Sequence, residues 1–115
     1  MIVNWIKAED GKEYPITFSN YVGVQLSIAE GLPANEAQKF LSNFASWKIE
    51  TLYRFYFFAF KAGALAAKKD FDMTEDQFVY WVTDGDETIM PQVTHVMTQS
   101  QPDPAKKQPA KANRK

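Results

Sequence analysis

The chain contains no cysteine and only one histidine. The missing cysteine excludes disulfide bonds, thiolate zinc sites and cysteine nucleophiles. Long apolar runs are also missing, because the longest, residues 55–60, is far shorter than the roughly 20 residues that cross a bilayer. The N-terminus has no basic segment followed by an apolar stretch of signal-peptide length. We therefore expect no membrane contact and a cytoplasmic protein.

Catalytic constellations are equally sparse. His95 has no carboxylate or hydroxyl at triad-like helical spacing, so the base lacks an orienting partner. The acidic stretch at residues 84–87 lacks the ligand spacing and closing glutamate of an EF-hand loop. The sequence thus predicts a protein that is not an enzyme, with no catalytic residue, cofactor or metal site.

What the chain does have is aromatic residues, 15% of its 115 positions, and a hydrophobic fraction of 45%. Both values favour a folded chain, and the length suits one domain, which we place at residues 1–98. From residue 99 on, five cations stand against one carboxylate, giving this tail a net charge of +4 and the rest −5. Three prolines and no large apolar residue predict that the tail, 99–115, is disordered. It also lacks aromatic residues for stacking on bases, so we expect no nucleic-acid partner.

A β-hairpin is predicted over about residues 2–18. Asp10 and Gly11 form a turn signal, because both tolerate the positive φ of hairpin turns. In the second strand Tyr14, Ile16 and Phe18 alternate onto one face, which leaves Pro15 and Thr17 on the other.

Four to five helices are predicted between residues 20 and 98. The first has Ser19 or Asn20 as its cap and Gly31 as its stop, with an apolar stripe of Val22, Leu26 and Ala29. The others cover about residues 34–46, 48–69, 75–83 and 87–98, and Thr74 and Gln77 fit a capping box before the fourth. The expected fold class is α+β, mostly α, with the hairpin packed on a helical bundle.

The longest predicted helix, residues 48–69, is apolar nearly all round. Its core face would include Ile49, Tyr56 and Phe60 at helical spacing. The opposite side carries charged residues together with large apolar ones, and two interpretations remain open. Either neighbours pack on both sides of a central helix, or the apolar residues form an exposed patch that binds a partner. The candidates for such a patch are Arg54, Phe57, Phe58, Lys61 and Leu65.

The order of elements resembles a known family. The stretch GKEYPITF in the hairpin, and LYRFYFFAFKAGALAAKKDFDMTEDQFVYWVTD across the long helix and its successor, resemble tail assembly chaperones of long-tailed bacteriophages and prophages. The resemblance covers about residues 12–97 and includes no catalytic signature.

The resemblance implies a chaperone in the cytoplasm of the host bacterium. Such a protein coats the tape measure protein, and keeps it soluble, before tail tube subunits polymerise around it. The expected partners are the tape measure protein and, as a second partner, the tail tube protein, with self-association through the aromatic helix left open. The alternatives are a structural or adaptor component retained in the phage tail, and an unrelated small regulator or enzyme.

Overall fold

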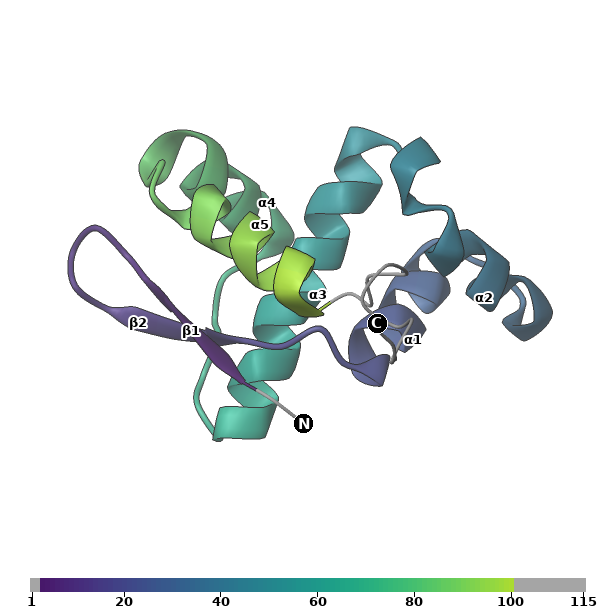
Figure 1. Ribbon diagram of the computed structural model, residues 1–115, viewed down its shortest axis with the longest axis horizontal. Helices are drawn as coiled ribbons and strands as arrows, with labels where there is room; N and C mark the ends of the chain where they lie inside the picture. The colour runs from purple at the N-terminus through teal and green to yellow at the C-terminus, as the bar shows by residue number, and fades with distance from the viewer. Residues whose placement is uncertain (1–2, 101–115) are drawn as a thin grey trace, which may run out of the picture.

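The computed structural model describes residues 3–100 and consists of a two-stranded hairpin and five α-helices (Figure 1). This arrangement confirms the predicted α+β, mostly α fold. The elements in chain order are β1 (Asn4–Lys7), β2 (Glu13–Ile16), α1 (Asn20–Ala29), α2 (Ala34–Ser42), the 3-10 turn η1 (Phe44–Ser46), α3 (Ile49–Ala67), α4 (Glu75–Tyr80), the π-helical turn η2 (Trp81–Gly85) and α5 (Ile89–Ser100).

Helix α3 is the central element, with the hairpin, α4 and α5 on one side and α1 and α2 on the other (Figure 1). Strand β2 meets α3 at Gly63, where a Cβ atom would overlap the backbone of Pro15 and Ile16. The N–H of Thr17 also donates a hydrogen bond to the carbonyl oxygen of Ala59, at 3.2 Å. The strand therefore packs backbone against helix, which only a glycine at position 63 permits.

The hairpin turns where the sequence predicted. Gly11 has φ +92°, and the N–H of Ala8 donates to the carbonyl oxygen of Lys12 at 2.8 Å. Pro15 pairs with Trp5 in the antiparallel register. Because Pro15 has no N–H, it adds no unpaired donor to the buried backbone beside α3.

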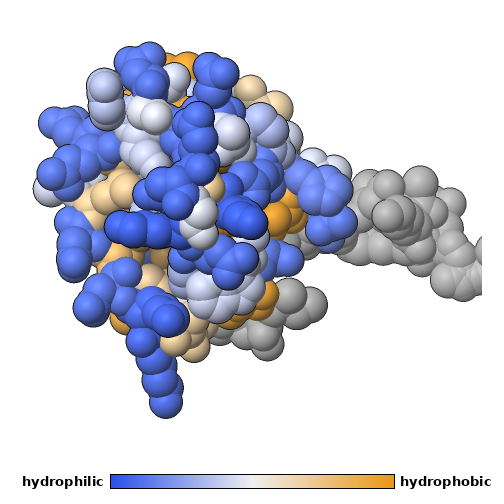
Figure 2. All heavy atoms as spheres, turned by 90° about the vertical axis from the view of Figure 1, so that its left-hand side faces the viewer, coloured by the Kyte–Doolittle hydropathy of each residue, from blue (hydrophilic) through white to orange (hydrophobic). Residues whose placement is uncertain are grey.

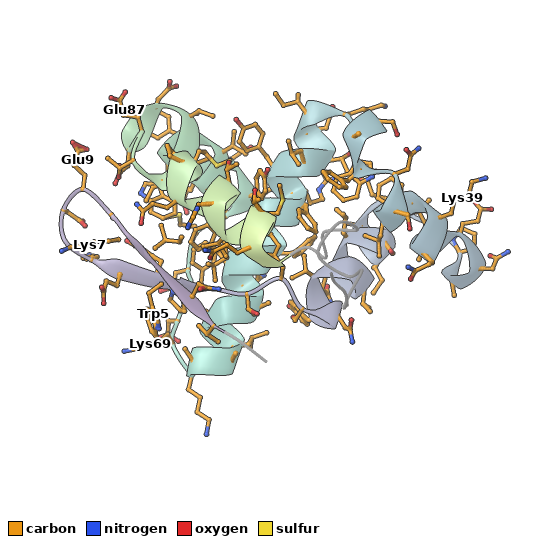
Figure 3. All side chains as sticks on the ribbon, viewed as in Figure 1. Trp5, Lys7, Glu9, Lys39, Lys69 and Glu87 are labelled. Atoms are coloured by element: carbon orange, nitrogen blue, oxygen red, sulfur yellow. The ribbon has the colours of Figure 1, made fainter. Side chains whose placement is uncertain are left out.

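Two side chains near α5 hold the hairpin in place. The amide of Gln92 accepts from the N–H of Lys7 at 3.0 Å and donates to its carbonyl oxygen at 2.8 Å. Asp86 is 5% exposed and accepts from the N–H of Glu9 at 2.7 Å, whereas the Glu9 side chain points outward (Figure 3). The hairpin is thus fixed through its backbone, and the N–H and carbonyl groups of Lys7 at the edge of β1 are paired, so they do not attract another strand.

The core between α3, α4 and η2 is aromatic. Phe60 and Phe78 are fully buried, with ring centroids 5.5 Å apart, and Phe71 stacks on Phe60 at 5.8 Å. Val82 is buried, whereas Trp81 is half-buried and its ring centroid lies 4.8 Å from that of Tyr14. Offset and edge-on aromatic pairs of this kind add stability beyond the area they bury.

Helix ends follow the predicted signals. Gly31 has φ +72° and closes α1, because its N–H donates to Ile28 while the N–H of Leu32 donates to Ser27. Thr74 and Gln77 form the predicted capping box of α4, with reciprocal bonds of 2.9 and 3.1 Å. Both signals act over a few neighbouring residues, which is why the sequence reveals them.

Four details of the sequence prediction are wrong. Ile49 is 69% exposed, because it is the first residue of α3 and lies beyond the part that β2 covers. In α1 Ser27, not Ala29, completes the buried stripe. Pro15 and Thr17 are buried together with Ile16, since α3 packs along β2. Residues 99–100 belong to α5, and the remainder of the predicted disordered tail lies outside the described residues.

Candidate functional site

The five candidate residues on α3 do not form an exposed aromatic patch. Phe57 is 7% exposed, and its ring lies 5.7 Å from Phe78 and 5.9 Å from Phe71. Phe58 is half-buried beside it. Of the two interpretations left open by the sequence, packing by neighbours therefore holds for Phe57, because α4 and the segment before it cover this side of α3.

Arg54 is engaged inside the molecule. Its guanidinium lies 2.8 Å from a carboxylate oxygen of Glu30 and 3.2 Å from one of Glu75, so it joins the end of α1 to the start of α4. Hydrogen bonds to Glu75, and then to Glu30, raise the pKa of Arg54 above its ordinary value. A guanidinium suits this bridging position because its fork of donors reaches two carboxylates at once.

The last two candidates differ from each other. The ammonium of Lys61 lies 5.3 Å from the ring centroid of Phe57, within the range of a cation–π contact. Leu65 is 62% exposed and remains accessible to a partner. A single exposed leucine is ordinary on a protein surface, so it does not make a site.

The candidate site is instead a groove at the other end of the molecule, formed by α1, α2 and η1. We name it the α1–α2 groove; its volume is about 740 Å³, and it is lined by 16 residues. Val24 and Ile28 stand on its α1 rim with 56% and 66% of their surfaces exposed, and Phe44 of η1 is 37% exposed. No residue of α2 is buried, so the groove is bounded by a helix with an incompletely covered apolar face.

An aromatic row forms part of the groove wall. The ring of Trp47 lies 5.2 Å from Phe55, and Phe55 lies 5.3 Å from Phe18, all three residues lining the groove. The indole N–H of Trp47 donates to the carbonyl oxygen of Phe40 at 3.0 Å, and the two rings stack. The row is therefore held rigidly and presents apolar ring surface to the groove.

Two hydroxyl groups beside the groove have no hydrogen-bond partner. Ser19 is the N-terminal cap residue of α1, yet its hydroxyl makes no capping bond. Ser27 is 7% exposed, and its hydroxyl is buried and likewise unpaired. Leaving a buried hydroxyl unpaired costs about 1–3 kcal/mol, so this wall is less well satisfied than an ordinary core.

The groove is uncharged. None of its 16 lining residues is ionisable, and α1 contains no charged residue at all. The charged residues of α2, Glu36 and Lys39, border a separate hollow of about 390 Å³, and Lys39 projects outward (Figure 3). By contrast, the opposite end of the molecule, on the left of Figure 1, shows a mostly hydrophilic face (Figure 2).

Sequence reasoning missed the groove and selected α3. A signal was present, because Val24 and Ile28 lie one turn apart on α1 and outside its buried stripe. The complete lack of charge in α1 pointed the same way, since a helix covered on one side only normally carries charges on the other. The strong aromatic signal of α3 was instead the signal of a core.

Two other kinds of site are absent from the described residues, a metal cluster and a membrane-spanning helix. Within residues 3–100 no group of three or more His, Asp or Glu side chains is placed to hold a metal ion. None of the helices described in this range is long and apolar enough to cross a membrane.

No family model, no curated protein and no solved structure matches the chain.

Proposed function

We propose that this protein is a tail assembly chaperone of a long-tailed phage or prophage, acting in the host cytoplasm, and that its partner is the tape measure protein. The observation that carries the proposal is the α1–α2 groove, which is open, is lined mostly by apolar residues and contains no ionisable residue. Helix-in-groove recognition places the apolar face of a partner helix into such a surface. The resemblance over residues 12–97 then supplies the identity of the partner.

The groove suits a holder better than an enzyme. A tape measure chain exposes apolar helical faces until the tail tube encloses it, so a chaperone needs apolar surface that accepts many similar segments. Aromatic rings and branched aliphatic residues provide this surface with few directional contacts. The negative charge of the body, −5 for residues 1–98, would keep copies soluble along a coated partner.

The test is co-expression of this chain with the long helical protein encoded beside it, followed by a pull-down and a solubility assay. We expect the partner to stay soluble with the natural chain and to aggregate with the Val24→Asp variant, because a carboxylate on the rim opposes burial. The matched control is Leu65→Asp, which places the same charge at a similarly exposed position on α3 and should leave rescue unchanged.

Two outcomes would contradict the proposal. If the partner aggregates with the natural chain and the chain elutes alone, the chaperone function is wrong. If the chain is instead found in purified assembled tails, a structural or adaptor role in the tail replaces it.

A further inference from the structure

We propose that the α1–α2 groove also binds a second copy of this chain, so that two α1 helices pack antiparallel across a two-fold axis. Val24 and Ile28 of each copy would insert into the groove of the other. The dimer and the partner helix would then exclude each other. The exclusion rests on the proposed function, whereas the dimer does not.

The rim of the groove has a shape that suits pairing with its own copy. Val24 and Ile28 are four residues apart, so they form a ridge along one side of α1, and both are more than half exposed. The groove beside them is hollow and apolar. A surface with a ridge next to a groove of the same character is complementary to itself after a two-fold rotation, which is the requirement of an isologous interface.

The groove also lacks the charge that would oppose self-association. A two-fold axis brings each surface against its own copy, so any net charge on the surface repels itself. The body carries −5, yet α1 and all groove-lining residues are uncharged. This groove therefore lets two acidic bodies meet without placing like charges together, and Asn20 and Gln38, which line it, supply polar groups to the contact.

The C-terminal segment of the chain is a poorer match for the groove than a second copy of α1. Residues 101–115 contain five cations and no large apolar side chain. An apolar, uncharged groove gives such a segment neither hydrophobic contact nor an opposite charge. The segment that does match the groove is the α1 ridge of another copy.

The size of the groove predicts a weak dimer. A stable interface uses about 20–30 residues from each side, and the groove offers 16. We expect dissociation in the micromolar range, which a tighter-binding partner helix can displace. The second copy would then cover the groove before the tape measure protein is made. Once that protein is present, it would displace the second copy and occupy the groove.

The first experiment is sedimentation equilibrium of the full chain from about 1 to about 500 µM, a range that brackets micromolar dissociation. We expect a monomer–dimer equilibrium that Ile28→Asp weakens by roughly 30-fold or more, as loss of a central apolar contact does. The control Leu65→Asp, with 62% exposure against 66% for Ile28, should not change it. A chain that is monomeric throughout, or a dimer indifferent to Ile28→Asp, would overturn the inference.

Cross-linking tests the antiparallel geometry, and the absence of native cysteine removes any background. Antiparallel α1 helices place Val24 opposite Ile28, so oxidation of mixed Val24→Cys and Ile28→Cys chains should give more mixed dimers than either chain alone. A Leu65→Cys chain measures random cross-linking. Equal yields from the mixed chains and from each single-cysteine chain would contradict the arrangement.

The disulfide-linked dimer of Val24→Cys and Ile28→Cys chains tests whether the dimer and the partner helix exclude each other. The oxidised dimer should fail to keep the tape measure protein soluble, and reduction should restore rescue. Undiminished rescue by the oxidised dimer overturns the exclusion. Failure of the natural chain, whose dimer is not cross-linked and can dissociate, rejects the proposed function but leaves the dimer to be judged by sedimentation.

Discussion

At the scale of single residues, two backbone positions on α3 show how local geometry selects an amino acid. Lys68 closes the helix with φ 59°, a left-handed conformation that glycine adopts without strain. Gly63 faces the backbone of β2, where no side chain fits. Lys68 is therefore a residue that its backbone conformation disfavours, whereas Gly63 is the residue that the close approach of β2 requires.

Lys68→Gly should raise the free energy of unfolding by about 0.5 kcal/mol. Removing the left-handed strain of a non-glycine residue gains about 1–2 kcal/mol, and the greater backbone freedom of glycine in the unfolded chain offsets part of this. Urea denaturation measures the difference. Lys69→Gly is the control, since Lys69 does not have positive φ; it should lower stability, and a gain there would contradict the explanation.

Gly63→Ala should lower the free energy of unfolding by about 2–3 kcal/mol, even though alanine favours helices by about 1 kcal/mol. The new methyl group would overlap the carbonyl of Pro15, and backbone cannot move aside as a side-chain tip can. Gly23→Ala is the matched control, because its methyl group meets the Leu41 side chain rather than backbone, with Cδ1 nearest at 2.9 Å. Thermal unfolding of both variants should show a clear loss for the first and a change within about 1 kcal/mol for the second. Equal effects would mean that Gly63 is not a contact point.

At the scale of elements, the two-stranded hairpin stays folded because it packs on helices. An isolated hairpin is marginally stable in water, so it depends on what it packs against. Here Gln92 and Asp86 bind its backbone at Lys7 and Glu9, while α3 covers β2. The C-terminal helix therefore stabilises the N-terminal hairpin across nearly the whole described chain.

This attachment should weaken in acid. The N–H of Glu9, and then the hydroxyl and N–H of Thr88, donate hydrogen bonds that hold the pKa of Asp86 below its ordinary value of 3.8. The folded state thus binds this proton less readily than the unfolded chain. The stabilisation is fully present above pH 3.8 and is lost as pH falls through the lower folded pKa.

Comparing the natural chain with Asp86→Asn tests this effect. Their difference in unfolding free energy should be largest at neutral pH and should shrink as pH falls below 3.8. Asp84→Asn, an exposed neighbour, serves as the control and should follow the natural chain. A difference that stays constant through acid would show that the carboxylate charge does not contribute.

At the scale of the whole molecule, α3 separates a well-packed end from an open one. The hairpin, α4, η2 and α5 enclose an aromatic core, whereas α1 and α2 leave an apolar groove. The well-packed end can supply stability while the open end accepts another helix. Substitutions in the aromatic core should therefore change the free energy of unfolding. Substitutions in the groove should instead change its binding to another helix.

Phe57→Ser and Leu65→Ser test this division on a single helix. Phe57→Ser should cost at least about 3–5 kcal/mol, a large share of the stability of a small domain, because it leaves a cavity and buries a hydroxyl. Leu65→Ser should change stability by no more than about 0.5 kcal/mol, since Leu65 is 62% exposed. Circular dichroism during denaturation measures both. If the Phe57→Ser chain folds with unchanged stability, Phe57 is not part of the core.

The sequence by itself determined the features that depend on near neighbours. The hairpin turn at Gly11, the stop at Gly31 and the capping box of Thr74 and Gln77 all involve residues a few positions apart, and all were predicted. The bounds of α3 and the α+β class also followed, because hydrophobic periodicity extends along a whole element.

Only the tertiary structure decided which apolar faces are covered. Phe57 and Leu65 both lie within the charged stripe of α3, and nothing local distinguishes them; α4 and the segment before it cover the first and leave the second exposed. The groove beside Val24 and Ile28 arises in the same way, because α2 packs on α1 without burying any of its own residues. Burial depends on elements distant in sequence, so the periodicity of one helix can show that a face is apolar but not what packs on it.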